Sequence, residues 1–306
     1  MKRRTALLAT AVLLASAVSL TLSACAPSRS GSLGPAPTGV PPSSAPASPA
    51  QTPPNPTADP SKAPPPSDVQ PAQPSSTLTI QVWFTRTGKV FPTRRTRPAT
   101  VATSRLALAE LIAGPSPAEA AAGVGNAIPA GTTFDIKGIN SGVVTVSFPA
   151  TFYADGRDAA RLRQAQVVYT LTQFPTVSRV GFQSAGEPAG WPVGRADYVD
   201  LLPAIVVTSP VIGQHVSSPV TVGGTADVFE ATVSVRILDA AGNEIATRFT
   251  TATCGTGCRG DYSTTVPYRL GAEQRGTVEV YEVSMKDGAR VHVVDVPVTL
   301  AASRAG

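Results

Sequence analysis

The sequence contains little of the chemistry that enzymes and metal sites use. Only two of its 306 residues are histidine, and only three are cysteine. His215 and His292 have no cysteine or carboxylate at the spacing of metal ligands, so we expect both to be surface residues or polar residues with a hydrogen-bond partner. No set of serine, histidine and aspartate indicates a nucleophilic site. We therefore predict no catalytic residue, no metal and no cofactor.

Charged residues are also scarce, at 15% of the chain. The formal net charge is +5, but Lys2, Arg3 and Arg4 supply three of the positive charges, which leaves +2 for the rest of the chain. Domains that bind nucleic acid carry a pronounced basic surface. The charge balance therefore gives no indication of nucleic acid as a partner.

Aromatic residues are absent from residues 1–76. Residues 26–76 carry only four charges but hold 16 of the 30 prolines. Such a segment cannot bury enough apolar surface to offset the entropy lost on ordering. We predict that residues 25–76 form a disordered linker rich in Pro, Ser and Ala, which reaches about 150 Å when fully extended. The hydrophobic cores must therefore follow residue 76.

The N-terminus has the pattern of a secretory signal peptide. Three basic residues precede the uncharged run from Thr5 to Ala24, and small residues close it. A permanent membrane helix is the weaker alternative, because nothing after Cys25 stops transfer. Residues 22–25, Leu-Ser-Ala-Cys, resemble a bacterial lipobox. This resemblance implies a signal peptide over residues 1–24 and a lipid on Cys25 that anchors the protein to the extracytoplasmic face of the cell membrane.

With Cys25 as the anchor, Cys254 and Cys258 remain as a pair. Outside the cytoplasm we expect them to form a disulfide that closes the small loop CGTGC. A catalytic redox pair is the weaker alternative, because such pairs usually have the spacing C-x-x-C. Residues 255–260 also match the pattern G-x-G-x-x-G, but a strand-like run follows them instead of the helix that a dinucleotide site needs.

Residues 77–186 predict a small α+β domain. Alternating apolar residues indicate strands, a period near 3.6 indicates helices, and Ser116 to Glu119 have the pattern of a capping box. Two strands are expected first, over residues 77–86 and 88–98, followed by a helix over 102–114 and a short helix over 116–122. Two strands about a turn over 132–149, a helix over 157–174 and a strand over 177–184 complete the expected order. This order predicts a mixed sheet with helices on one face.

Asp155 and Asp158 flank the start of the expected long helix. Two nearby carboxylates are found in glycosidases, but helix capping and the helix dipole explain both residues without catalysis. We therefore expect a structural role for them.

Residues 205–300 predict an all-β sandwich, separated from the first domain by a linker at residues 187–204. Seven short β-rich runs occur in about 100 residues with no helical run between them. Turn signals such as Ala241-Gly242-Asn243 and Asp287-Gly288 separate the runs. In the last run, Val294, Val296, Val298 and Leu300 are expected to face the core and Asp295 to lie outside it.

Several blocks of the first domain resemble the GerMN domain, a module of bacterial sporulation and spore germination proteins. The blocks are LALAELIAGPSPAEAAAGVGNAIPAGT, GVVTVSFP and QVVYTLTQFPTVSRVGFQ, within about Leu78 to Gly186. The resemblance implies a fold like that of the ring-building modules of envelope complexes, with no catalytic activity.

The sandwich region resembles the immunoglobulin-like domain of bacterial spore germination, which often follows a GerMN domain. The blocks are SSPVTVGGTADVFEATVSVRILD, CGTGCRGDYSTTVPY and VEVYEVSMKDG, within about Ile205 to Leu300. The order of the two resemblances supports both assignments.

One cluster of charges has a functional appearance: Arg86, Lys89, Arg94, Arg95 and Arg97, around the first expected hairpin. The structural explanation is an edge strand that its charges protect from aggregation. The functional alternative is contact with anionic lipid headgroups or cell-wall polymers, with an affinity that falls as salt rises.

The sequence thus predicts a lipoprotein without enzymatic activity, whose two domains bind other components of the cell envelope. An envelope protein is the expected partner. Binding of peptidoglycan or another cell-wall glycan, by the sandwich, is the alternative.

Overall fold

The computed structural model describes residues 76–303, which belong to one compact unit. The predicted signal peptide, the predicted lipid attachment site Cys25 and all but the end of the predicted linker 25–76 lie outside the described residues. No helix among residues 76–303 is long and apolar enough to cross a membrane.

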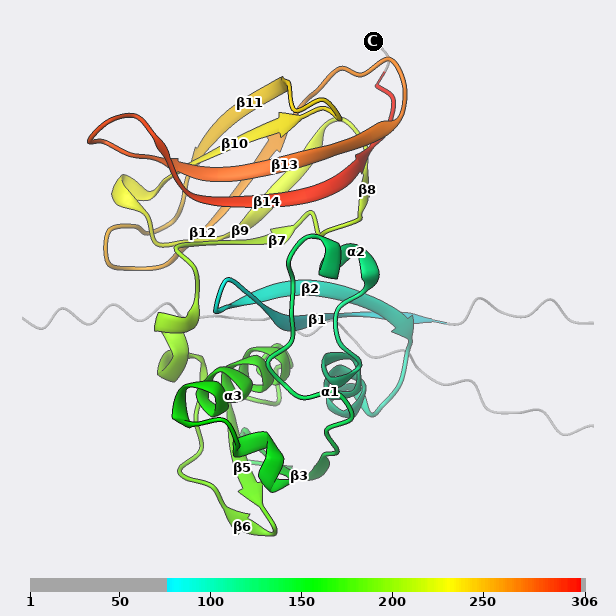
Figure 1. The fold of residues 1–306 in the computed structure, drawn as a ribbon, viewed down its shortest axis with the longest axis vertical. Helices are drawn as coiled ribbons and strands as arrows, with labels where there is room; N and C mark the ends of the chain where they lie inside the picture. The colour runs from blue at the N-terminus through cyan, green and yellow to red at the C-terminus, as the bar shows by residue number, and fades with distance from the viewer. Residues whose placement is uncertain (1–75, 304–306) are drawn as a thin grey trace, which may run out of the picture. The chain divides into compact units, whose positions relative to one another are not determined.

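The first domain contains two separate sheets (Figure 1). A hairpin of two ten-residue strands forms one sheet, and a four-stranded sheet in the order β3-β4-β5-β6 forms the other. Strands β4 and β5 are parallel, and helix α3 makes the crossover between them that parallel strands require. The elements are β1 (Thr77–Arg86), β2 (Lys89–Pro98), α1 (Thr103–Ala113), α2 (Pro117–Ala121), β3 (Asp135–Asn140), β4 (Val143–Phe148), the 3-10 turn η1 (Ala150–Tyr153), α3 (Arg157–Leu171), β5 (Arg179–Ser184) and β6 (Glu187–Pro188).

The elements predicted from the pattern of the first domain are all present, and the α+β class is confirmed. The capping box also forms: the Ser116 side chain accepts from the Glu119 N–H, and the Glu119 carboxylate accepts from the Ser116 N–H at 2.7 Å. The separation of the first hairpin into a sheet of its own was not predicted, because pairing between strands leaves no trace in the periodicity of either strand.

The prediction that Asp155 caps the long helix is wrong. Helix α3 begins after Gly156, which makes no side-chain cap. Asp155 has a positive φ of 67° and pairs instead with Arg163, eight residues further along the chain. The Arg163 guanidinium also donates to the carbonyls of Ala127, Phe152 and Ala154 at 2.8–3.1 Å, so it joins the loop at Ala127 to the segment around η1. Asp158 lies in the first turn of the helix, where its negative charge interacts favourably with the helix dipole, as expected.

Helix α3 packs against β1 on one side and against β5 on the other (Figure 1). Toward the hairpin, the Tyr169 ring lies 4.7 Å from the Trp83 ring. Toward the four-stranded sheet, Phe148, Phe152 and Phe182 form an aromatic cluster. Because neighbours cover both sides, residues 165–171 are buried, which is more of the helix than the single apolar stripe predicted.

A row of polar side chains, two on α3 and one just after its end, completes the outer edge of β1. The Gln173 side chain accepts from the Gln81 N–H at 2.7 Å, Thr170 Oγ1 accepts from the Trp83 N–H at 3.0 Å, and Gln166 donates to the Trp83 carbonyl at 3.0 Å. Backbone bonds between Thr85 and Gly125 continue the same edge. The helix therefore takes the place of a third strand and satisfies backbone groups that would otherwise be buried without partners.

Residues 187–204, predicted as a linker, are ordered against the first domain. They contain β6 and the 3-10 segment η2 (Arg195–Leu201). Val193 forms a β-bridge with Val180, and Tyr198 is buried with its hydroxyl bonded to Gln164 at 3.2 Å.

The second domain is a two-sheet β structure with the seven strands predicted and one short addition. One sheet has the order β11-β10-β13-β14-β8, and the other has the order β12-β9-β7. Gly242 and Gly288 have positive φ at the predicted turns. The strands are β7 (Ile205–Ser209), β8 (His215–Val216), β9 (Val220–Ala226), β10 (Thr232–Leu238), β11 (Glu244–Thr251), β12 (Gly260–Val266), β13 (Gln274–Val283) and β14 (Arg290–Leu300), with the 3-10 turn η3 (Phe229–Ala231).

The last strand faces the core largely as predicted. Val296, Val298 and Leu300 are buried, and Val294 packs against the core from a partly buried position. Asp295 points to the other face but is half-buried, because it lies beside Glu279 and close to the first domain.

Candidate binding cleft

The β1–β2 turn presents two cationic side chains at the boundary between the domains. Thr87 and Gly88 form its two central residues, with φ of 49° and 74°. Two positive φ values are typical of the tight hairpin turn whose twist matches that of the strands, and glycine adopts such a φ without strain. Arg86 and Lys89 are paired across this turn, so both stand at the same end of the hairpin.

A cleft of about 560 Å³ lies beside this turn. Its walls come from three segments: the hairpin, residues 202–205 up to the first residue of β7, and the start of β14. Most of the lining is apolar, and Val90 and Ile205 at its base are fully buried. The lining residues are Arg86, Thr87, Lys89, Val90, Phe91, Leu202, Pro203, Ala204, Ile205, His292, Val293 and Val294.

Backbone carbonyls hold the two cations of the cleft. Arg86 Nη1 donates to the Asp295 carbonyl at 2.8 Å, and its guanidinium lies over the Phe91 ring at 5.4 Å. Lys89 Nζ donates to the Asp200 carbonyl at 2.5 Å. The Asp200 carboxylate is occupied by Arg161, at 2.6 and 2.7 Å. Within residues 76–303, neither Arg86 nor Lys89 forms an ion pair with a carboxylate, so the cleft has a cationic rim over an apolar floor.

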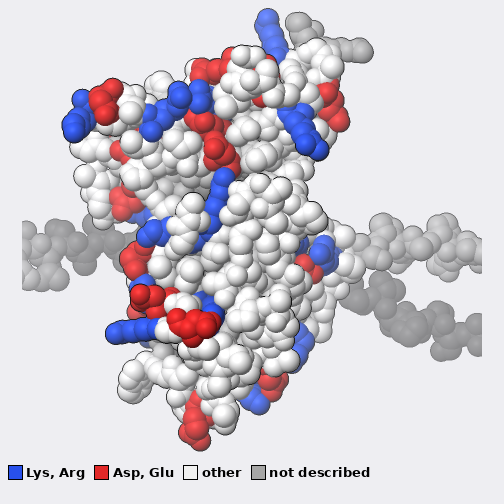
Figure 2. Space-filling model, in the orientation of Figure 1, with Lys and Arg blue, Asp and Glu red and all other residues white. Residues whose placement is uncertain are grey.

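The other three cations of the predicted cluster lie further along β2. Arg95 forms a two-pronged pair with Glu119 at 2.8 and 2.6 Å, and Arg97 forms one with Glu110 at 2.7 and 2.9 Å. Arg94 is exposed, and its side chain has no hydrogen bond or ion pair in the part of the chain that the structure describes. Across the face shown in Figure 2, lysine and arginine alternate with aspartate and glutamate instead of gathering in one basic patch.

The structural explanation of the basic cluster has direct support in the β2 edge. The backbone N–H groups of Trp83 and Gln81 point away from β2, toward α3. In an antiparallel pair the opposite residues, Pro92 and Arg94, then point their own backbone groups away from β1, to the open edge of β2. Pro92 has no N–H to donate. The carbonyl of Arg94 accepts from Arg95 at 3.0 Å, and that of Thr96 accepts from Arg97 at 3.1 Å. These features block strand addition at this edge.

The remaining candidate residues have local partners. His215 Nε2 lies 2.8 Å from Glu273, and His292 Nε2 lies 3.7 Å from Glu282. Strand β12 follows the G-x-G-x-x-G segment, so it lacks the helix of a dinucleotide site. No group of three or more His, Cys, Asp or Glu in residues 76–303 is placed to hold a metal.

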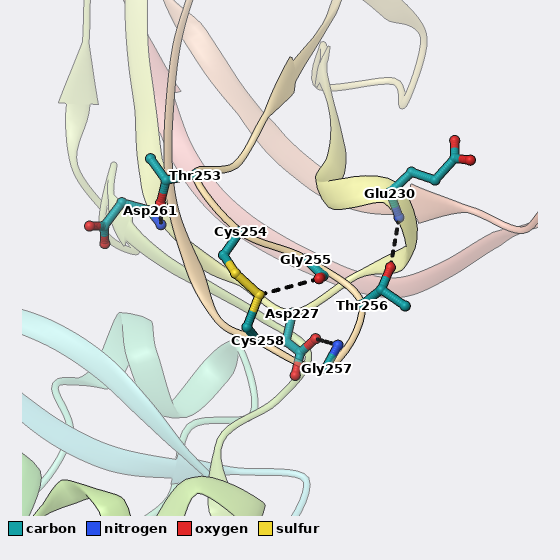
Figure 3. The surroundings of a disulfide bond; sticks show 9 residues. All are labelled: Asp227, Glu230, Thr253, Cys254, Gly255, Thr256, Gly257, Cys258 and Asp261. Atoms are coloured by element: carbon teal, nitrogen blue, oxygen red, sulfur yellow. Dashed lines mark hydrogen bonds between the residues drawn. A yellow bond between two sulfur atoms is a disulfide. The ribbon is translucent and has the colours of Figure 1, made fainter. Parts of the chain in front are cut away.

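The predicted disulfide joins Cys254 and Cys258, whose Cα atoms are 5.7 Å apart (Figure 3). The loop is fixed from outside as well: the Asp227 carboxylate accepts from the Gly257 N–H at 2.9 Å, and Thr256 accepts from the Glu230 N–H at 3.1 Å.

The next residue after the disulfide, Arg259, extends this support to the cleft. Its guanidinium donates to the Pro203 carbonyl at 2.6 Å and to the carbonyls of Ala204 and Thr225 at 3.3 Å. Pro203 and Ala204 line the cleft, so Arg259 holds one of its walls. Burial lowers the pKa of Arg259, and the nearby Asp227 opposes this effect.

Sequence reasoning identified only Arg86 and Lys89 among the cleft residues. Residues 202–204 were assigned to the linker 187–204 and Ile205 to the sandwich. His292 was considered as a metal ligand and Val294 as a core residue, but neither was linked to a cleft. No local signal marks these segments, because only the packing of the two domains brings them together.

Comparison with known proteins identifies two families. Residues 74–190 match the family described as "Sporulation and spore germination", and residues 204–289 match the family described as "Immunoglobulin-like domain of bacterial spore germination". No protein with a curated function matches the chain. Both domain resemblances drawn from the sequence are therefore confirmed.

Solved structures give more distant similarities. The first GerMN domain of the sporulation protein GerM from Bacillus subtilis is 21% identical, with 39% of this chain and 95% of that chain covered and a TM-score of 0.33. The tandem GerMN domains of the same protein are 18% identical, with 74% and 61% covered and a TM-score of 0.35. A putative lipoprotein from Clostridium perfringens is 15% identical, with 40% and 89% covered and a TM-score of 0.26.

Proposed function

Because one domain matches the sporulation and spore germination family and the other matches the immunoglobulin-like domain of bacterial spore germination, we propose that this chain is a non-enzymatic binding and assembly module of the cell envelope. In this proposal a lipid on Cys25 anchors the protein to the extracytoplasmic face of the membrane. The two domains together bind an envelope protein.

One observation carries the proposal: both domains build the walls of one cleft. Arg86 and Lys89 of the first domain meet the carbonyls of Asp295 and Asp200, and Arg259 of the second domain holds the segment between the domains. These contacts favour a fixed composite surface over two independent domains. Such a surface supports recognition of a partner by shape and charge.

The experiment is crosslinking in intact cells, followed by purification of the full tagged protein. The comparison is a Cys25→Ala variant, which cannot receive the lipid. We expect a specific membrane or envelope protein with the wild type, and a reduced yield of it with Cys25→Ala because the variant is not held at the membrane. Recovery of no protein above an untagged control would contradict the assembly role.

A second candidate function is binding of a cell-wall glycan by the sandwich. The Phe249 side chain is 74% exposed on β11. Phe249 is paired with Ser234, and Ser234 with Tyr281, so the two rings share the outer face of the sheet, about two strand spacings apart, roughly 9.5 Å. The exposed Phe249 ring, with the partly buried Tyr281 ring beside it, offers a surface on which sugar rings can stack.

Purified cell-wall sacculi test this second function. We expect wild-type protein to be retained and a Phe249→Ala variant to be released, with Phe229→Ala as the control because Phe229 is also exposed but lies on η3, outside this row. Equal retention of all three proteins would remove Phe249 as the basis of glycan binding.

A further inference from the structure

We propose that the interdomain cleft binds an acidic, apolar-containing segment of a protein partner, with carboxylates of the segment at Arg86 and Lys89 and its apolar side chains on the floor. The inference rests on the proposed binding function and adds to it the chemistry of the partner. Neither the domain families nor the known structures in the comparison assign a ligand to this cleft.

The first argument is that the rim cations have no ion-pair partner in residues 76–303. Arg86 and Lys89 are each held by one short bond to a backbone carbonyl, and the Asp295 and Asp200 carboxylates act on them only from a distance, without forming a salt bridge. A guanidinium has five N–H donors and an ammonium has three, so both keep donors for a ligand. Bonds from these groups to a carboxylate are about twice as strong as bonds between neutral groups.

The second argument is the contrast with the rest of the hairpin. Arg95 and Arg97 already hold Glu119 and Glu110, each through two hydrogen bonds, so their charges are neutralised within the chain. Of the charged side chains on this hairpin, only Arg86 and Lys89 line the cleft, and neither forms an ion pair within residues 76–303. This placement distinguishes a ligand-binding role from edge protection.

The apolar floor favours a protein segment over a polyanion. Val293 is 44% exposed, and Leu202 and Pro203 are partly exposed, so the cleft presents accessible apolar surface above the fully buried Val90 and Ile205. Apolar side chains of a partner gain free energy by covering such a floor, whereas a phosphate-rich polymer does not. The volume of about 560 Å³ lies in the range of ordinary ligand pockets, about 300–1,000 Å³.

Carboxylates around the rim argue further against a polyanion or an anionic membrane. Asp200 lies beside Lys89, and Glu282 lies 3.7 Å from His292. An extended anionic surface would meet these charges as well as the two cations. A peptide can place single carboxylates at Arg86 and Lys89 and uncharged side chains elsewhere.

A short synthetic peptide of alternating leucine and glutamate is the probe. It is titrated by calorimetry into the full mature chain. The chain carries Cys25→Ala, so that no lipid attached to Cys25 can bind the probe. Matched peptides carry glutamine or lysine in place of glutamate. We expect the glutamate peptide to bind about tenfold more tightly than the glutamine peptide, with a preference that weakens as salt rises.

Three variants and a control locate the binding. Arg86→Gln with Lys89→Gln should abolish the preference for glutamate, whereas Arg86→Lys, which keeps the charge, should retain most of it. Val293→Glu should abolish binding of the glutamate peptide without touching the contacts between the domains, because Val293 lines the cleft and is 44% exposed. Arg94→Gln should change nothing, because this exposed cation of the same hairpin lies outside the cleft.

Three results would overturn the inference: equal affinity for the glutamate and glutamine peptides, glutamate binding that survives Val293→Glu, or binding of phosphatidylglycerol vesicles that exceeds peptide binding. If the crosslinking experiment still recovers an envelope protein in any of these cases, the proposed function stands and only the assignment of the cleft fails.

Discussion

Glu119 shows how a single residue combines local and long-range roles. Its side chain is 3% exposed, and it accepts hydrogen bonds from the Arg95 guanidinium, the Thr93 hydroxyl and the Ser116 N–H. The last bond belongs to the capping box of α2, whereas the first two come from β2. Glu119 therefore fixes the short helix on the hairpin.

The first prediction concerns Glu119→Gln. Burial raises the pKa of the Glu119 carboxyl, but the hydrogen bonds from Arg95, Thr93 and Ser116 outweigh it and hold the pKa below the usual 4.5. The ionised group therefore stabilises the fold above pH 4.5, and this contribution is lost as pH falls through the folded pKa. We expect Glu119→Gln to lower the free energy of unfolding by roughly 1.5–3 kcal/mol at neutral pH.

Urea unfolding over a series of pH values provides the measurement. The difference between wild type and Glu119→Gln should shrink as pH falls below 4.5. Glu187→Gln, at an exposed position on β6, is the control and should have little effect on the free energy of unfolding. A difference that stays constant with pH would exclude the carboxylate charge as its cause.

The pKa of Asp295 is shifted in the opposite direction from that of Glu119. Burial first, and then the neighbouring Glu279 carboxylate, raise the pKa of Asp295 above the usual 3.8, although Arg86 opposes them. A carboxyl whose pKa is raised in the folded state destabilises that state when ionised, and the cost disappears as pH falls below 3.8.

We therefore predict that Asp295→Asn raises the free energy of unfolding at neutral pH. The amide carries no charge and can donate to Glu279, and the backbone carbonyl that receives Arg86 is unchanged. The gain should fade as pH approaches 3.8, and the exposed Asp261→Asn should show no comparable gain. A loss of stability at neutral pH would mean that the Asp295 charge has a favourable partner in the fold.

At the scale of elements, α3 has two functions in the fold. It makes the crossover between β4 and β5, and its polar row closes the edge of β1. Gln166 and Thr170 are fully buried, so each of their hydrogen bonds replaces one to water that is lost on folding. The hairpin β1–β2, which carries the cleft cations, is thereby fixed to the rest of the domain.

Thr170→Val tests this row. Valine fills the same space but leaves the buried Trp83 N–H without its acceptor, so we expect a loss of roughly 1–3 kcal/mol in the free energy of unfolding. Hydrogen exchange of the Trp83 amide should quicken at the same time. The same change at exposed Thr251 should stay within about 0.5 kcal/mol. Unchanged exchange at Trp83 would show that another group accepts this bond.

At the scale of the whole molecule, the two domains meet through side chains that bind backbone carbonyls. Arg86 reaches Asp295, and Arg259 reaches Pro203 and Ala204. Because the acceptors are backbone carbonyls, these contacts do not depend on the side chain of the accepting residue. The disulfide beside Arg259 restrains the loop from which this guanidinium extends.

We predict that Arg259→Met weakens the junction between the domains. The carbonyls of Pro203, Ala204 and Thr225 lose a charged donor, which should lower the free energy of unfolding by roughly 1.5–3 kcal/mol. Limited proteolysis should also cleave residues 187–204 faster. Arg269→Met, at an exposed position on the same domain, is the control. Cleavage at the wild-type rate would show that the segment is held without Arg259.

Patterns within short segments were sufficient to predict much of the fold. The period of apolar residues located the strands and helices, Ser116 and Glu119 marked a capping box, and the two remaining cysteines indicated the disulfide. Each of these features depends on residues that lie close together in the sequence. The order of the blocks was also enough to identify both families.

Features that join distant segments were decided only by the tertiary structure. Gln166 and Trp83 are 83 residues apart, and Arg86 and Asp295 are 209 apart, so no local pattern links them. The five cations of the first hairpin look alike in the sequence, yet packing gives Arg95 and Arg97 carboxylate partners and leaves Arg86 and Lys89 at the cleft. The sequence determined which elements form, because local propensity and periodicity set them. Only the packing of those elements decided which charges are neutralised and where a cavity opens.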